Sequence, residues 1–208
     1  MRLFTKSVYD FRGFDEVIVK QGRVAYREVE PKRSKLFAGI AKGLSQIGIR
    51  EGSSVLYLGA SHGYTASFVS DVVGRQGRVW CVDVAPRVVR DLVLVCEQRA
   101  NMLPLLADCR QPSSYKEFLP SPVDVVFQDI AQRDQVSIFL KNCDAYLKKG
   151  GFGLLSLKAR SIDVARKPAH VFKESYEQLV AAEGYVVVDK KDLEPFEKDH
   201  MLFVVKRR

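Results

Sequence analysis

The sequence predicts an α/β fold in which a parallel sheet is covered by helices on both faces. Hydrophobic residues make up 47% and charged residues 28% of 208 residues, which is typical of one globular domain. Near-continuous apolar runs recur along the chain, and such runs are typical of strands that are buried on both faces. Between these runs lie amphipathic segments that are long enough for crossover helices, as in doubly wound sheets.

The first thirty residues follow a different pattern. Residues 16–20 and 23–29 are two strand-like runs joined by Gln21-Gly22, which predicts a β-hairpin. From Ser34 onward the apolar residues take a helical period. The residues expected to share one face of that helix are Leu36, Phe37, Ile40, Leu44 and Ile47. We therefore expect a small N-terminal β region over residues 1–33 and a larger domain over residues 34–208.

Five apolar runs in the larger domain predict its parallel strands. In chain order they are residues 53–60, 78–84, 102–108, 123–130 and 151–159. Crossover helices are expected at residues 65–73, 86–99 and 132–147. A further helix around residues 171–183 precedes two last strand-like runs, residues 185–193 and 200–207. Since these last two runs are close together in the chain, at least one of them is expected to be antiparallel to its neighbour.

Composition excludes several classes of protein. No apolar run reaches the 18 or so residues of a membrane span, and the N-terminus lacks the apolar core of a signal peptide, so we expect a cytosolic protein. No pair of cysteines forms CxxC, and no histidine lies at zinc-finger spacing, which favours buried, reduced thiols over a metal site. The cysteines are Cys81, Cys96, Cys109 and Cys143. The net charge of +8 suits a protein that binds polyanions, but it also suits an ordinary basic enzyme.

Ligands of such sheets bind beyond the carboxyl ends of the strands, so the residues at those ends are the candidate site. The first predicted strand runs into a turn, residues 59–65, in which Gly59 and Gly63 permit positive φ and a close approach of the backbone to a ligand. The turn is not GxGxxG and lacks the lysine of a P-loop, so it disfavours a phosphate cradle.

The next three strands each end in an aspartate: Asp83, Asp108 and Asp129. Taken alone, Asp83 suits a ribose-binding carboxylate and a helix N-cap ahead of Pro86 about equally. Three carboxylates at one edge, with no lysine or arginine expected directly beside them, indicate a nucleoside with a cationic tail rather than a phosphate chain. S-adenosylmethionine has this chemistry, so the pattern favours a methyltransferase over a dehydrogenase.

Six stretches carry a more specific signal: VLYLGASHGYTASFVSDVVG (residues 55–74), RVWCVDVAPRVVRDL (78–92), VDVVFQDIAQRDQ (123–135), SLKARSID (156–163), LEPFEKDH (193–200) and residues 33–36. In these stretches the sequence resembles the archaeal fibrillarins, the methyltransferases of box C/D guide-RNA particles. The resemblance implies a Rossmann-like, seven-stranded methyltransferase sheet behind a small N-terminal β region. The implied reaction is methylation of ribose 2′-hydroxyls in rRNA and tRNA with S-adenosylmethionine as the cofactor.

The resemblance also implies roles for individual residues. The cofactor contacts that match the family, together with the residues of the glycine turn, are Gly59, Ala60, Gly63, Tyr64, Thr65, Asp83, Val84, Asp108, Cys109, Asp129 and Gln132. The catalytic constellation that matches is Lys35, Asp129, Lys158 and His200. Four features depart from the family. Tyr64 stands where threonine is usual, Asp83 stands where glutamate is usual, the N-terminal region is shorter, and Glu30-Pro31-Lys32 replaces an Asn-Pro.

The two lysines also make chemical sense by themselves. A 2′-hydroxyl is a poor nucleophile that must lose a proton, and a lysine near other positive charges gives up its own proton more readily. Lys158 is expected at the same edge as Asp129 and within its reach, as a base or as an electrostatic clamp. Asp129 would fix the geometry of the cluster. His200 suits an ordinary histidine at a strand entry almost as well.

RNA contacts are expected from basic residues in loops at or near this edge: Lys32, Arg33, Arg133, Arg160, Arg166 and Lys167. His62 and His170 are expected on the surface. No base-reading motif is present, which is consistent with an enzyme directed by a guide. The resemblance implies guide RNA, target RNA, a Nop-family scaffold protein and a kink-turn-binding ribosomal-type protein as partners. The alternatives are a catalytically silent subunit of such a particle, or a methyltransferase for a protein glutamine or a stand-alone RNA.

Overall fold

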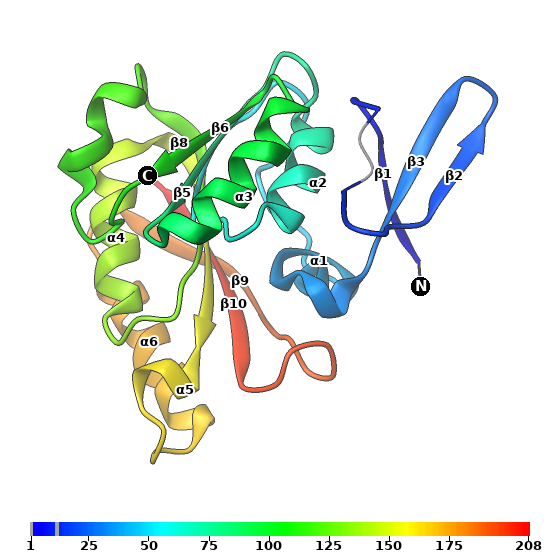
Figure 1. Cartoon of the computed structure of the whole chain (residues 1–208). Coiled ribbons are helices and arrows are strands. Elements are labelled where there is room, and N and C mark those ends of the chain that lie inside the picture. The colour runs from blue at the N-terminus through cyan, green and yellow to red at the C-terminus, as the bar shows by residue number, and fades with distance from the viewer. Residues whose placement is uncertain (1, 11–12) are drawn as a thin grey trace.

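The computed structural model describes residues 2–10 and 13–208, and a seven-stranded sheet forms its centre (Figure 1). The strand order is β6-β5-β4-β7-β8-β10-β9. The strands are β4 (Ser54–Leu58), β5 (Arg78–Asp83), β6 (Met102–Leu106), β7 (Val123–Asp129), β8 (Leu147–Lys158), β9 (Tyr185–Asp192) and β10 (His200–Arg207). The first five are parallel, and β10 is antiparallel to both β8 and β9, so the predicted fold class and the antiparallel end are confirmed.

Helices cover both faces of this sheet, as expected for strands that are apolar on both sides. One face is covered by α1 (Lys35–Ala41), α2 (Tyr64–Val73) and α3 (Pro86–Glu97). The other is covered by η2 (Pro112–Phe118), α4 (Gln135–Tyr146) and α6 (Pro168–Ala181), and the short α5 (Ala159–Ile162) follows β8 directly (Figure 1). Each face buries its own hydrophobic core against the sheet. None of the helices in the described part of the chain is long and apolar enough to cross a membrane.

The predicted N-terminal hairpin is confirmed as β2 (Ile18–Gln21) and β3 (Val24–Val29), with Gly22 at a φ of 60° in the turn. The hairpin belongs to a three-stranded antiparallel sheet whose third strand, β1 (Leu3–Lys6), pairs with β3 and packs near α2. β1 was not predicted, because four residues are too few to establish an alternating pattern. The turn η1 (Pro31–Arg33) leads from this sheet into α1.

The helix after Ser34 is shorter than its apolar period predicted. It ends at Ala41, and Gly43 then takes a φ of 84°. The Leu44 N–H donates to the Gly39 carbonyl at 3.0 Å, and the Gly43 N–H donates to the Ile40 carbonyl at 2.9 Å. This is a Schellman motif, which satisfies the last carbonyls of the helix. The expectation that Leu44 and Ile47 lie on the helix was therefore wrong, although Leu44 is buried.

The topology brings the predicted site residues to one edge. Asp83 and Asp129 are the last residues of β5 and β7, and Lys158 is the last residue of β8. Because these strands are parallel, their carboxyl ends meet at the same edge. His200 begins the antiparallel β10 and pairs directly with Lys158. Of the cysteines, Cys81, Cys96 and Cys143 are buried and Cys109 is half-buried, and all four are free thiols.

Candidate functional site

Two adjoining cavities lie at the carboxyl edge of the sheet. The acidic cavity, about 240 Å³, is lined by Asp83 and Asp129, the last residues of β5 and β7, and by Asp108. Asp108 was expected to end its strand, but β6 ends at Leu106 and Asp108 follows in the loop. The lysine cavity, about 710 Å³, is lined by Lys35, Asp129, Lys158 and His200. The two cavities share Gly59, Ser61, Asp129, Ile130 and Ala131, so they form one continuous site. The structure thus brings together all of the predicted catalytic residues and every predicted cofactor residue except Gly63.

The glycine turn is shaped by close backbone contacts. Gly59 has a φ of 82°, and a Cβ atom on it would lie 2.2 Å from the Asp129 carbonyl oxygen. Only glycine therefore lets the end of β4 pass so close to the end of β7. Gly63, with a φ of 90°, lines neither cavity, because a Cβ there would meet the Leu92 side chain on α3 at 2.9 Å. Its role is to bring α2 against α3.

The Asp83 carboxylate links two loops at the entrance of the acidic cavity. It accepts hydrogen bonds from the Ser61 N–H at 3.0 Å and from the Ala85 N–H at 3.1 Å. Ala85 precedes the first residue of α3, and no side chain caps that helix. The N-cap interpretation of Asp83 was therefore wrong. Asp83 holds the glycine turn in place and faces the cavity.

The expectation that no cation lies directly beside the acidic strand ends was also wrong. Arg110 Nη2 donates a hydrogen bond to Asp108 Oδ2 at 2.7 Å, and Arg110 Nε donates to Oδ2 at 2.9 Å and to Oδ1 at 3.1 Å. The hydrogen bonds from the side chain and the backbone N–H of Arg110 hold the pKa of Asp108 below its ordinary value. The Asp-x-Arg spacing at Asp108 was the sequence signal for this pair. Arg110 places a positive charge at one end of the acidic cavity.

Lys35 lies between two carboxylates in the lysine cavity. Its Nζ is 3.5 Å from Asp129 Oδ2 and 3.9 Å from Glu197 Oε1. Glu197, which was not predicted as a site residue, reaches the site from the segment between β9 and β10. Lys35 is the first residue of α1, whose N-cap, Ser34, accepts a hydrogen bond from the Phe37 N–H. Ser34 also accepts one from the hydroxyl of Thr65 at 3.0 Å, which links α1 to α2.

Lys158 has a different electrostatic setting. Asp129 pairs across the sheet with Ser156, so Lys158 stands two residues beyond it. Contrary to the expected contact, no ion pair joins Lys158 to Asp129 or to any other carboxylate in the described ranges. Lys158 is exposed to the cavity beside His200, its partner on β10. The site therefore holds one lysine paired with carboxylates and one that is not.

His200 is 7% exposed and lines the lysine cavity. Its Nδ1 lies 2.6 Å from the Lys198 carbonyl oxygen. Since a carbonyl oxygen can only accept, Nδ1 carries the proton and donates it. Nε2 is then the ring nitrogen that can accept a hydrogen bond when the ring is neutral.

The unusual Tyr64 connects the site to the N-terminal region. Its hydroxyl accepts a hydrogen bond from the Glu30 N–H at 3.1 Å, and the Arg33 guanidinium lies 4.1 Å from the centre of its ring. Phe14 meets the same ring edge-on, with the two centroids 5.4 Å apart. Tyr64, Arg33 and Phe14 all line the lysine cavity. One wall of that cavity is therefore supplied by the residues before α1.

The basic residues predicted to contact RNA fall into two groups. Arg160 pairs with Asp199 at 3.0 Å, and Arg166 pairs with Glu174. Those that are exposed and form no ion pair with the described residues are Lys32, Arg33, Arg133 and Lys167. His62 and His170 are exposed, as expected, and His62 Nε2 lies 3.7 Å from Asp91 Oδ2.

The donor set fits S-adenosylmethionine. Carboxylates at or just beyond three strand ends can accept hydrogen bonds from ribose hydroxyls and from an ammonium group. The glycine turn lets the backbone approach such a ligand closely. The lysine cavity, continuous with the first through Asp129, then places two amines next to whatever the acidic cavity binds.

Comparison with known proteins gives consistent results. The family model described as Fibrillarin matches residues 1–208. The fibrillarin-like rRNA/tRNA 2′-O-methyltransferase of Pyrococcus horikoshii is 44% identical over 99% of this chain and 90% of its own. Aeropyrum pernix fibrillarin, solved with natively bound S-adenosyl-L-methionine, is 39% identical with a TM-score of 0.89, over 98% of this chain and 88% of that one. A fibrillarin/Nop5p complex contains a chain that is 33% identical with a TM-score of 0.85, and the match covers 98% of this chain and 93% of that one.

Proposed function

Because the chain belongs to the fibrillarin family, we propose that it methylates ribose 2′-hydroxyls of rRNA and tRNA with S-adenosylmethionine, directed by a guide RNA. The observation that carries the proposal is the joining of two unlike cavities through Asp129. One presents carboxylates suited to the cofactor, and the other presents two lysines suited to a nucleophile. A catalytically silent subunit would not need the lysines of the second cavity.

The acidic cavity would hold the cofactor. Asp83 would accept hydrogen bonds from ribose hydroxyls, while Asp108 and Cys109 line the same cavity farther along the edge. Gly59 and Asp129 line both cavities. Ala60 lines the lysine cavity, and Gln132, which follows β7, lines the acidic cavity. When bound, S-adenosylmethionine supplies an electrophilic methyl group on a positively charged sulfur. Its positive charge suits Asp83, the aspartate of this cavity that forms no ion pair with the described residues.

The lysine cavity would prepare the nucleophile. The ion pair with Asp129 fixes the position of the Lys35 side chain, so Lys35 can position the ribose. Lys158 has no carboxylate partner in the described part of the chain, so it is the lysine better suited to accept the proton of the 2′-hydroxyl. His200, held by its bond to the Lys198 carbonyl, would orient the substrate through Nε2.

The family also bears on partners. The fibrillarin/Nop5p complex supports a Nop-family partner, and the names of the relatives support an RNA substrate. Guide RNA and a kink-turn-binding ribosomal-type protein complete the proposed particle. The relatives come from archaea, whose cells lack a nucleus, so we place the particle in the cytoplasm. Within the chain, residues 1–33 would act as an accessory β region to the methyltransferase domain at residues 34–208.

The test is transfer of a labelled methyl group, measured with the protein alone, with the scaffold protein, and with scaffold protein and guide RNA together. Calorimetry first measures S-adenosylmethionine binding. Label in the guided ribose only with the complete set supports the proposal. Cofactor binding without transfer in the complete particle would indicate a silent subunit. Label in unguided RNA or in protein would favour the alternative substrates.

A further inference from the structure

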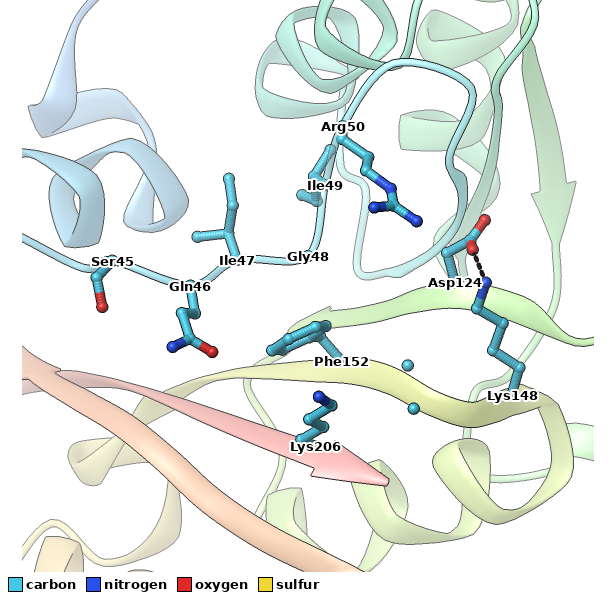
Figure 2. A pocket seen from close by; sticks show the side chains of 12 residues that line it. Ser45, Gln46, Ile47, Gly48, Ile49, Arg50, Asp124, Lys148, Phe152 and Lys206 are labelled. Atoms are coloured by element: carbon cyan, nitrogen blue, oxygen red, sulfur yellow. Dashed lines mark ion pairs between the residues drawn. The ribbon is translucent and has the colours of Figure 1, made fainter. Parts of the chain in front are cut away.

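A third cavity lies at the opposite edge of the seven-stranded sheet (Figure 2). It has a volume of about 480 Å³ and lies between the loop of residues 45–50, the start of β8 and the end of β10. Because β10 is antiparallel to β8, the last residues of β10 lie beside the first of β8, and Lys206 pairs with Phe152. This amino-edge cavity shares no residue with the acidic or the lysine cavity.

An irregularity in strand pairing creates the cavity. Val123 pairs with Leu147 and Val125 with Phe152, so β8 advances five residues while β7 advances two. The extra residues of β8, which include Gly150 and Gly151, bulge out of the sheet and form the floor. The loop above approaches Phe152 so closely that a Cβ atom on Gly48 would lie 2.5 Å from the ring. The cavity is therefore a defined feature of the backbone.

The charges of this cavity do not balance. Arg50, Lys148 and Lys206 are its cations, and Asp124 is its acid. Asp124 is fully engaged: it pairs with Lys148 and accepts two hydrogen bonds from Ser54, each 2.7 Å long. Burial alone would raise the pKa of Asp124, but the hydrogen bonds from Lys148 and Ser54 outweigh it and hold that pKa below its ordinary value.

Two cations remain without a carboxylate. Neither the Arg50 guanidinium nor the Lys206 amine forms an ion pair with any residue in the described ranges. In Figure 2 the Arg50 side chain extends from the loop toward the strands, and Lys206 lies on the far side of Phe152. The Lys206 amine is 5.5 Å from the centre of the Phe152 ring. Lys149, next to the floor, and Arg208, after the end of β10, add exposed positive charge at the same edge.

We propose that the amino-edge cavity binds backbone phosphate of the RNA on which the enzyme acts. The inference rests on the proposed function, which makes RNA the substrate. A guanidinium binds phosphate oxygens in pairs and an ammonium binds as a point charge, so Arg50 and Lys206 are the cations that phosphate recognition uses. The Gly48 backbone lies so close to the Phe152 ring that a Cβ atom there would be 2.5 Å away, and the Lys206 amine lies over the ring, so little of the ring is left for a base to stack on. The site therefore takes phosphate and is indifferent to base.

The position of the cavity defines its contribution. A strand of seven residues such as β7 spans roughly 20 Å at about 3.3 Å per residue, so the phosphate lies well away from the reacting ribose. Contacts there add affinity that is equal in the ground state and the transition state. Their loss should raise KM for RNA and leave kcat unchanged.

The decisive variant is Arg50→Gln/Lys206→Gln. Its matched control, Lys141→Gln/Lys173→Gln, removes the same charge from exposed positions on α4 and α6. The probe is a single-stranded oligoribonucleotide of mixed sequence, and its affinity is measured by fluorescence anisotropy over a range of potassium chloride concentrations. Two lost phosphate contacts should lower the affinity about tenfold at low salt and reduce the slope of log K against log salt by about 1.4. The control should change the affinity less than about twofold.

If Arg50→Gln/Lys206→Gln gives the same slope of log K against log salt as the control variant, the proposal is overturned. Unchanged RNA affinity together with loss of binding to the scaffold protein would also overturn it, because it would make the cavity a dock for an acidic protein surface. Titration with inorganic phosphate separates the sources of the anion: saturation by phosphate without competition against the oligonucleotide would indicate a small-anion site and also overturn it.

Two further measurements separate the loss of charge from a loss of structure. Arg50→Lys/Lys206→Arg keeps both charges and should retain the wild-type slope, whereas a merely structural role would not be restored by charge. Calorimetry with S-adenosylmethionine should give wild-type affinity for all variants. If the wild-type particle transfers no methyl group, the proposed function fails, while the comparison of RNA affinities still decides the role of the cavity.

Discussion

Lys35 Nζ lies 3.5 Å from Asp129 Oδ2, so the first residue of α1 and the last residue of β7 form an ion pair at the centre of the site. Both side chains are partly shielded from solvent, with exposed fractions of 27% and 19%. Lys158, in the same cavity, has no such partner among the described residues. This difference between the two lysines underlies the first two predictions.

Asp129→Asn should lower methyl transfer about a hundredfold or more, because Lys35 loses the charge that fixes it. Cofactor affinity should fall by a smaller factor, since Asp129 also lines the acidic cavity. Single-turnover rates and calorimetry measure the two effects separately. Glu197→Gln is the control, because Glu197 is the more distant of the two carboxylates and should retain most of the rate. A near-wild-type rate for Asp129→Asn would exclude a role for the ion pair.

Lys158→Ala should abolish methyl transfer and leave the fold and cofactor binding nearly intact. Lys158→Arg should not restore the rate if Lys158 is the base, because arginine cannot give up its proton near neutral pH. Single-turnover rates of both variants, with calorimetric cofactor affinity beside them, make the comparison. An active Lys158→Ala would remove Lys158 from the mechanism. An active Lys158→Arg would make it an electrostatic clamp instead of a base.

Asp83→Ala should weaken S-adenosylmethionine binding by about 1–3 kcal/mol, as for the loss of a hydrogen-bonding partner at a mostly buried site. The Ser61 and Ala85 N–H groups also lose their acceptor, so the glycine turn should loosen at the same time. Isothermal calorimetry gives the affinity. Asp91→Ala, which removes a half-buried acid on α3, is the control. Equal affinities for the two variants would mean that Asp83 does not contact the cofactor.

Asp71→Asn should destabilise the protein by about 3–5 kcal/mol, because it removes the buried carboxylate that Arg27 and Arg99 share. Asp71 accepts from Arg27 at 2.7 Å and from Arg99 at 2.8 Å, and both side chains of each pair are fully buried. Denaturant unfolding measures the loss. Glu177→Gln, which removes an exposed pair with Lys173, should change stability by less than about 0.5 kcal/mol. If Asp71→Asn lowers the free energy of unfolding by as little as Glu177→Gln, the ion pairs of Asp71 with Arg27 and Arg99 contribute little to stability.

Cys109 should react slowly with iodoacetamide at neutral pH. Burial, followed by the charge of Asp108, raises the pKa of Cys109 to about 11, so the thiol stays protonated below that pH. At pH 8 the thiolate is on the order of 0.1% of the total, and the rate should climb as the pH approaches 11. S-adenosylmethionine should slow the reaction further, since Cys109 lines the acidic cavity. Mass spectrometry of wild type and Cys109→Ser follows it, and rapid labelling at pH 7 would contradict the prediction.

The sequence by itself determined the sheet and the edge at which the site lies. Apolar runs such as residues 123–130 can be recognised as strands in the sequence, because a strand buried on both faces can carry few polar side chains. Asp83 and Asp129 could be assigned to one edge because parallel strands bring their carboxyl ends together, whatever the details of packing. The resemblance to a family then implied roles for residues such as Lys35 and His200, for which the periodicity of the sequence indicates no function.

Only the tertiary structure decided which charges meet. The contact of Lys35 with Asp129 and Glu197, and that of Asp71 with Arg27 and Arg99, join segments far apart in the chain. Local patterns report the face on which a side chain lies, but not which distant side chain faces it. The end of α1 at Ala41 likewise depended on the positive φ of Gly43, which the apolar period cannot reveal. The amino-edge cavity arose from a shift in register between β7 and β8, which exists only once the two strands are paired.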